Sequence, residues 1–292
     1  MNAALPAFLV EAVFYLGSIF AETRAWFSGV GSRSTQAALL WLSALPPYLM
    51  FSLLAGTFAP RAFELVALLT GVLAFWHVFL PRRAVYDAGF LIVAAAPVLL
   101  RVFPRLYVSP DGHLPVSILG HLMWVRLAIA ALLILREWQP GAFGLWPHAR
   151  EWRVGVLYYL GAIVPVAGLA LALGDVRFVP PRGEWWQIAG IAIGTFFGIL
   201  WVVAISEELF FRGVIERALL NGWHSKTAAV LVSAVLFGSV HLWFHHFPNW
   251  QRALVATAIG IACGLAYAQT GSVRAPMVTH AFVVTTWRVF FR

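Results

Sequence analysis

The chain has 292 residues, of which 61% are hydrophobic and only 11% are charged, whereas about a quarter of the residues of an average soluble domain are charged. Its mean hydropathy of +0.83 predicts an integral membrane protein and excludes an ordinary soluble domain. The formal net charge of +8 does not indicate nucleic-acid binding, because the basic residues are scattered between apolar runs and never form a stripe or a tail.

The first apolar run, residues 3–20, has no basic residue before it and no convincing small-residue cleavage site. A secretory signal has a basic start and a small-residue cleavage site. Because this run has neither, we expect it to be retained as a membrane span. The fourteen tryptophans and the scattered arginines suit anchors at the two membrane interfaces, and membrane lipids are therefore expected partners. A disulfide within the chain is excluded, because Cys263 is the only cysteine.

A helix needs about 20 mostly apolar residues to cross the hydrocarbon core of a bilayer. Several apolar runs of this chain are shorter, so the sequence predicts about eight true spans and assigns the remaining runs to interfacial or re-entrant segments. The predicted fold is an all-α, polytopic membrane bundle. The candidate runs lie near residues 3–20, 36–58, 63–80, 88–103, 114–135, 153–173, 186–206, 227–244, 252–270 and 275–290.

Two polar interruptions divide the chain, one over residues 136–153 and one over residues 174–186. The second contains paired prolines, which cannot continue a helix. We therefore expect a hydrophobic multi-span region over residues 1–185 and a separate C-terminal core over residues 186–290.

The stretch AISEELFFRGV, residues 204–214, follows a long apolar run and contains an unusual group of charges: Glu207, Glu208 and Arg212. A charge at the centre of a membrane costs at least ~2.5 kcal/mol, so such residues are functional candidates. Glu208 and Arg212 are four residues apart and lie one above the other on a helix, where they can form an ion pair. Glu207 is rotated by about 100° and points elsewhere. The spacing predicts that the arginine holds one carboxylate while the other faces a cavity.

A second interpretation is a helix that leaves the membrane at Glu207 and displays an ordinary salt-bridged surface turn, continued by Glu216 and Arg217, since charges gather where spans end. Two histidines bear on the choice, because His241 and His280 stand inside apolar runs downstream. A lone histidine of this kind is more often a packing residue. Two of them, on separate predicted helices near an acid pair, predict a shared site where a shielded carboxylate activates water.

Three motifs here resemble those of the CAAX prenyl protease and bacteriocin-processing (CPBP, or ABI) family of intramembrane endopeptidases. Residues 207–213, EELFFRG, match the E-E-x-x-x-R motif, and residues 237–241, FGSVH, match F-x-x-x-H. His280 falls where the histidine of the third motif belongs. Order and spacing agree for all three, and together they are far more specific than any one. The resemblance covers residues 186–290.

The resemblance implies helical spans around a water-filled polar cavity, and peptide-bond hydrolysis near the membrane surface. Glu207 would be the general base that takes a proton from water, and His241 would help to hold or polarise that water. Glu208 would support the site, and Arg212 would fix the acid-bearing turn. His280 would stabilise the oxyanion of the tetrahedral intermediate, or bind a metal in accounts that class the family as metalloproteases.

One position departs from the family pattern. The third motif usually places asparagine four residues after its histidine, where this chain has Val284. Valine cannot donate a hydrogen bond, so the oxyanion site is either poorer or completed by another group. Thr285 is the first candidate because it is one position round the helix, and Thr279 and Ser239 are weaker candidates.

A zinc-dependent intramembrane metalloprotease is an alternative. His241 and His245 are four residues apart, as in zinc sites built on one helix. Together with His280 and a carboxylate of the acid pair they could hold zinc. The residues around His245, FHHFP, look like the exit of a helix into the interface, which favours solvated histidines over ligands. No metal is therefore assigned.

Two alternatives involve no catalysis. In an immunity or scaffold protein, Val284 would mark lost activity. A transporter also uses intramembrane acids and histidines, but we find no pair of matching broken helices in the two halves of the chain. For the leading interpretation we expect a membrane-anchored or lipidated peptide or protein substrate, cut near its C-terminal or juxtamembrane end. The expected location is the inner membrane of a bacterium.

Overall fold

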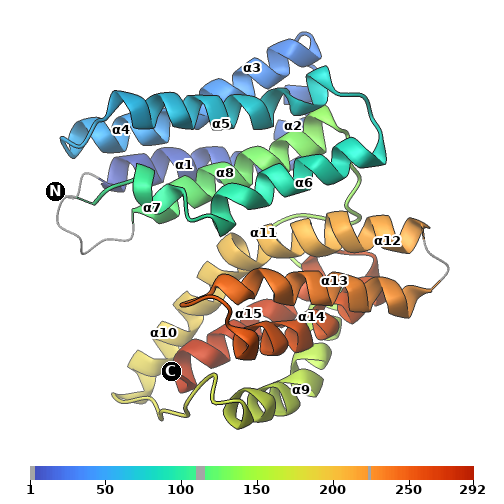
Figure 1. Ribbon diagram of the computed structural model, residues 1–292. Helices are drawn as coiled ribbons and strands as arrows, with labels where there is room; N and C mark the ends of the chain where they lie inside the picture. Colours follow the sequence, from blue (N-terminus) through green and yellow to red (C-terminus); the bar gives the residue numbers. More distant parts are fainter. Residues whose placement is uncertain (1–3, 110–115, 223–224) are drawn as a thin grey trace. The chain divides into compact units, whose positions relative to one another are not determined.

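The computed structural model describes residues 4–109, 116–222 and 225–292, and the regular elements of these residues are all helical (Figure 1). The predicted all-α fold is thereby confirmed. Contacts divide the chain into two compact units, Met1–Trp138 and Gln139–Arg292. Among the described residues, seven helical segments are long and apolar enough to cross a membrane, or eight if the bent pair at the N-terminus is one span, in line with the about eight spans that the sequence predicts.

In the first unit, prolines and a serine set where helices begin. Ser32 caps α3 by accepting the backbone N–H of Thr35, and Pro46 and Pro60 open α4 and α5, where a missing N–H costs little. The break at Leu45 separates α3 from α4, and Arg33–Leu54 together form one candidate span. The helices of this unit are α1 (Ala4–Ile19), α2 (Ala21–Ser28), α3 (Arg33–Ala44), α4 (Pro46–Leu54), α5 (Pro60–Phe79), α6 (Ala84–Leu99), α7 (Phe103–Leu106), α8 (Ser117–Ala130) and the π-helical η1 (Ala131–Leu135).

A buried ion pair explains the glutamate inside the first apolar run. Arg126 Nε donates to Glu11 Oε1 at 2.7 Å, and both side chains are almost fully buried. The same guanidinium donates to the hydroxyl of Ser43 at 2.9 Å and to its backbone carbonyl at 3.1 Å. A buried charge needs such pairing to be tolerated, so this network holds α1, α3 and α8 together.

The second unit is built around one long helical run. Residues Trp185–Gly222 form 38 continuous helical residues, so the span predicted over 186–206 ended too early. The helix continues because its charged turn is buried and paired rather than solvated. The elements of this unit are α9 (Ala149–Ala172), α10 (Trp185–Gly198), η2 (Ile199–Ala204), α11 (Ile205–Glu208), η3 (Leu209–Glu216), α12 (Arg217–Gly222), α13 (Lys226–Val240), the 3-10 turn η4 (His241–Trp243), α14 (Trp250–Thr270) and α15 (Arg274–Phe290).

Glycines let α13 and α14 approach closely. A Cβ atom on Gly238 would lie 1.9 Å from Thr257 Oγ1, and one on Gly260 would lie 3.1 Å from Ala234 Cα. One on Gly264 would lie 2.8 Å from a carboxylate oxygen of η3. Gly260 and Gly264 form a G-x-x-x-G pair, and this pair serves helix packing.

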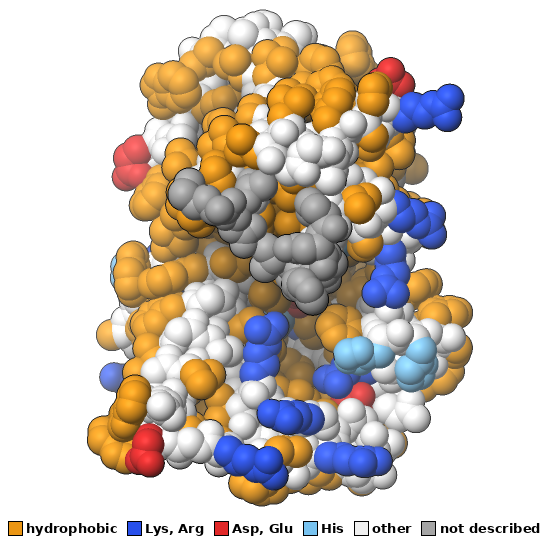
Figure 2. Space-filling view, turned by 90° about the vertical axis from the view of Figure 1, so that its left-hand side faces the viewer, with side chains coloured by type: hydrophobic (Ala, Val, Ile, Leu, Met, Phe, Trp, Pro, Cys, Tyr) orange, Lys and Arg blue, Asp and Glu red, His pale blue; other side chains and the backbone are white. Residues whose placement is uncertain are grey.

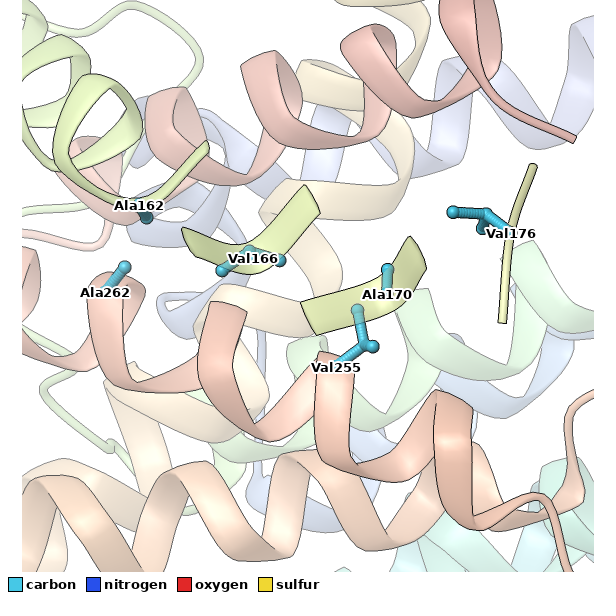
Figure 3. Packing of buried hydrophobic residues seen from close by; sticks show 6 residues of the cluster. All are labelled: Ala162, Val166, Ala170, Val176, Val255 and Ala262. Atoms are coloured by element: carbon cyan, nitrogen blue, oxygen red, sulfur yellow. The ribbon is translucent and has the colours of Figure 1, made fainter. Parts of the chain in front are cut away.

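Small apolar side chains join α9 to α14 (Figure 3), so α9 packs within the second unit. The cluster consists of Ala162, Val166, Ala170, Val176, Val255 and Ala262. By contacts this unit begins before residue 186, and the extent of the predicted core over residues 186–290 stays a prediction.

Candidate active site

The acid-bearing turn has an unusual backbone. The four-residue α11 lies between the π-helical segments η2 and η3. Wide turns of this kind are rare and occur frequently at functional sites. Here they carry a chain of charges, because Arg212 lies close to Glu208 on one side and to Glu216 on the other.

The predicted ion pair within this turn is present and fully buried. Arg212 Nη1 lies 3.0 Å from Glu208 Oε2, and neither side chain is exposed. Arg212 Nη2 donates to the carbonyl of Gly260 at 2.9 Å, and its guanidinium lies 4.7 Å from the ring centre of Phe237. The surface-turn interpretation is therefore wrong, because Glu216 is buried as well.

His280, from α15, binds the inner carboxylate. Its Nδ1 lies 2.6 Å from Glu208 Oε1. A carboxylate paired with arginine only accepts hydrogen bonds, so we assign the proton to Nδ1 as the donor. Such a charge-assisted hydrogen bond fixes the orientation of the imidazole. Its other nitrogen, Nε2, is left for the remaining acid.

Glu207 is that remaining acid. Its side chain is 36% exposed, whereas that of Glu208 is fully buried, so the pair is split as the helical spacing predicts. Glu207 Oε2 lies 3.9 Å from Nε2 of His280. This distance is too long for a hydrogen bond and suits two groups that bind the same water or substrate oxygen.

The ring of Phe237 lies between His241 and His280 and contacts both imidazoles. His241 follows α13, and its Nδ1 lies 2.9 Å from the carbonyl of Phe237, which can only accept, so Nδ1 donates. The ring of Phe237 lies 4.9 Å from that of His241 and 5.9 Å from that of His280. Within the described ranges, no hydrogen bond or ion pair joins His241 to Glu207 or Glu208.

The zinc alternative requires His241 and His245 to lie on one helix, and in the structure they do not. Helix α13 ends at Val240, and His245 lies beyond the 3-10 turn η4. His245 is exposed, has a φ of 63° and contacts the ring of Phe244 at 5.1 Å between centroids. His241 and His245 therefore do not share one helix face.

The threonines and the serine proposed to replace the family asparagine differ in their hydrogen bonds. Thr279 donates to the carbonyl of Gly155 at 2.9 Å, and Ser239 donates to that of Leu236 at 2.7 Å. The Oγ1 atom of Thr285 is buried and has no hydrogen-bond partner among the residues that the structure describes. Of the three hydroxyls, only that of Thr285 is uncommitted.

Cys263 is a neighbour of the site that sequence reasoning missed. Its sulfur on α14 and ligand atoms of Glu208 and His280 all lie within 4.8 Å of one another, and all three residues are buried. These residue types can bind metals, but both oxygens of Glu208 are already engaged by Arg212 and His280. The carboxylate of Glu208 therefore offers a cation no oxygen that is not already in contact with Arg212 or His280.

Glu216, which the sequence analysis placed only in the surface-turn interpretation, also belongs to this group of charges. Its carboxylate is buried, lies 4.0 Å from Arg212 Nε and has no hydrogen-bond partner within the described part of the chain. Its spacing of four residues from Arg212 was a signal that could have found it. Cys263 gave no such signal, because it lies on a different helix.

Comparison with known proteins identifies the segment that carries the site. Residues 188–286 match the family model described as type II CAAX prenyl endopeptidase Rce1-like. No curated protein and no solved structure matches the chain. The matched segment contains Glu207, Glu208, Arg212, His241 and His280. The resemblance indicated by the three motifs is therefore confirmed, and residues 188–286 of this multi-pass membrane protein are similar to the Rce1-like CAAX prenyl endopeptidase family.

Proposed function

We propose that this protein is an intramembrane endopeptidase in which Glu207 activates the attacking water. The observation that carries the proposal is the difference in burial and in partners between the two glutamates. Glu208 is buried between Arg212 and His280, whereas Glu207 is 36% exposed and lies 3.9 Å from the free nitrogen of His280. The match to an endopeptidase family over residues 188–286 supports the same activity.

In the proposed reaction, a water molecule binds to the carboxylate of Glu207, which takes one of its protons as the water oxygen attacks the scissile carbonyl carbon. A positioned base typically contributes about 10² to 10⁴-fold to the rate. The new C–O bond places negative charge on the carbonyl oxygen. When the C–N bond breaks, Glu207 returns the proton to the leaving amine, so the carboxylate is regenerated.

His280 is proposed to stabilise the oxyanion. Because Nδ1 donates to Glu208, a protonated imidazole presents Nε2–H on the side of Glu207, where the reacting carbonyl would bind. Removing one oxyanion donor typically costs about 10² to 10³-fold. Thr285, whose buried hydroxyl is uncommitted, is the proposed second donor in place of the family asparagine.

His241 is proposed to help position the water or the substrate. Its Nδ1 is occupied by the carbonyl of Phe237, which leaves Nε2 as an acceptor when the ring is neutral. Arg212 is proposed to act indirectly, by holding Glu208 ionised and in place.

The proposed substrate is a membrane-anchored or lipidated peptide or protein that is cut near its C-terminal or juxtamembrane end, and the proposed location is a bacterial inner membrane. The zinc alternative makes a separate prediction, stoichiometric zinc in the purified protein and activity that a chelator abolishes. The immunity or scaffold alternative predicts that alanine variants of the site keep their biological effect.

The decisive experiment compares membrane-protein termini in cells that carry active protein or the Glu207→Gln variant. We expect a new terminus that disappears in the variant. Glu64→Gln is a matched control, because Glu64 is an exposed glutamate in the first unit. Cleavage that continues undiminished in a folded Glu207→Gln protein would refute the proposed role of Glu207.

A further inference from the structure

A pocket lies on the second unit, between the loop before α10 and the end of α15. Its volume is about 190 Å³, several times the roughly 30 Å³ that a water molecule occupies in the liquid. Arg182, Arg288 and Arg292 line it, together with apolar residues of the same two segments. We call it the arginine pocket. Figure 2 shows basic side chains gathered at the lower end of the face it displays.

The two walls of this pocket are tied together by the backbone. Arg177 N–H donates to the carbonyl of Arg292 at 2.7 Å, and Arg292 N–H donates back at 2.9 Å. Val179 N–H donates to the carbonyl of Phe290 at 2.8 Å. The segments that carry the arginines are therefore positioned before any ligand binds, which lowers the entropic cost of binding.

The arginines of the pocket lack an ion pair with any acidic side chain that the structure describes. Other arginines of this unit are paired. Glu184, the nearest acid in sequence, uses its side chain to cap α10. The C-terminal end of α15 contributes roughly half a negative charge, which three guanidinium groups outweigh. An anion would relieve their mutual repulsion.

Neighbouring aromatic residues indicate the depth of the pocket in the membrane. Trp185 and Trp186 begin α10, directly after the loop, and are 78% and 59% exposed. Exposed tryptophans at the end of a span are typical of the headgroup region. The pocket therefore opens where lipid phosphates lie, and basic pockets at this depth bind anionic headgroups.

We propose that the arginine pocket binds the phosphate of an anionic phospholipid. Guanidinium groups match phosphate oxygens in a bidentate geometry, which a zwitterionic lipid satisfies less well because its own ammonium competes. The site is separate from the proposed chemistry, although Arg288 lies on α15, the helix that carries His280.

Native mass spectrometry of the purified full chain tests this proposal. The protein is offered phosphatidylglycerol and phosphatidylcholine in equal amounts, and retained lipids are counted. We expect wild type to retain phosphatidylglycerol preferentially, and the double variant Arg182→Gln, Arg288→Gln to retain it at least about tenfold more weakly, because two charge-assisted contacts are lost. Arg153→Gln is the matched control, since Arg153 is exposed on α9 outside the pocket, and it should behave as wild type.

Three results would overturn the proposal. Wild type could retain both lipids equally, or the double variant could retain phosphatidylglycerol as strongly as wild type does. Displacement of the lipid by millimolar inorganic phosphate would instead assign the pocket to a soluble phosphate. An Arg288→Lys variant separates charge from geometry: it should retain more lipid than Arg288→Gln but less than wild type, because lysine cannot bind in a bidentate manner.

Discussion

Replacing Glu208 by glutamine should destabilise the second unit, because it leaves the buried guanidinium of Arg212 without its nearest counter-charge. The two groups are fully buried and 3.0 Å apart. At an effective dielectric constant of about 20, unit charges at that distance attract by roughly 5 to 6 kcal/mol. Glu216 remains 4.0 Å from Arg212 Nε in the variant, so the guanidinium keeps one neighbouring carboxyl group. Breaking a buried pair costs about 3 to 5 kcal/mol, and we expect a cost near 3 kcal/mol.

Thermal unfolding of the purified protein in detergent measures this effect. At roughly 2 to 4 °C per kcal/mol, Tm should fall by about 6 to 12 °C in Glu208→Gln. Glu207→Gln is the matched control, because its side chain is partly exposed and outside the ion pair with Arg212, so its free energy of unfolding should change by less than about 0.5 kcal/mol. The reasoning is refuted if Tm of Glu208→Gln stays within about 1 °C of wild type.

Two further changes test the site and its scaffold. In His280→Asn, the amide can replace Nδ1 as donor to Glu208 but nothing replaces Nε2, so cleavage should fall by about 10² to 10³-fold with little change in Tm. His280→Gln should lower Tm, because its longer side chain does not place the amide where Nδ1 lies. Equal stability of the two variants would contradict the assigned hydrogen bond. Gly238→Ala should destabilise the protein by about 1 to 3 kcal/mol in thermal unfolding, because its Cβ would clash with Thr257 on α14. Gly194→Ala, where nothing lies within 4 Å, is the control and should cost nothing; a harmless Gly238→Ala would show that α13 and α14 can separate freely.

Local geometry made part of the site predictable. The relation of Glu208 to Arg212, and the different direction of Glu207, follow from helical spacing alone, and both are present in the structure. The membrane class followed from composition, because apolar runs of this length have few stable alternatives in water. The three motifs also predict that His280 lies near the acids.

Only the tertiary structure decided whether the charged turn is buried or displayed. The same sequence would suit a solvated helix end, and the outcome depends on groups from other helices: the carbonyl of Gly260, the ring of Phe237 and the imidazole of His280. Cys263 reaches the site from α14. No spacing within one segment encodes such contacts.

The sequence by itself therefore determined the all-α membrane class, the ion pair within one helix and the different directions of the two acids. Tertiary packing decided that Glu216 is buried, that His245 lies outside the helix and that α10–α12 continue to Gly222. The physical reason is that helical periodicity relates only residues a few positions apart, whereas the free energy of a buried charge depends on the partners that distant segments bring to it.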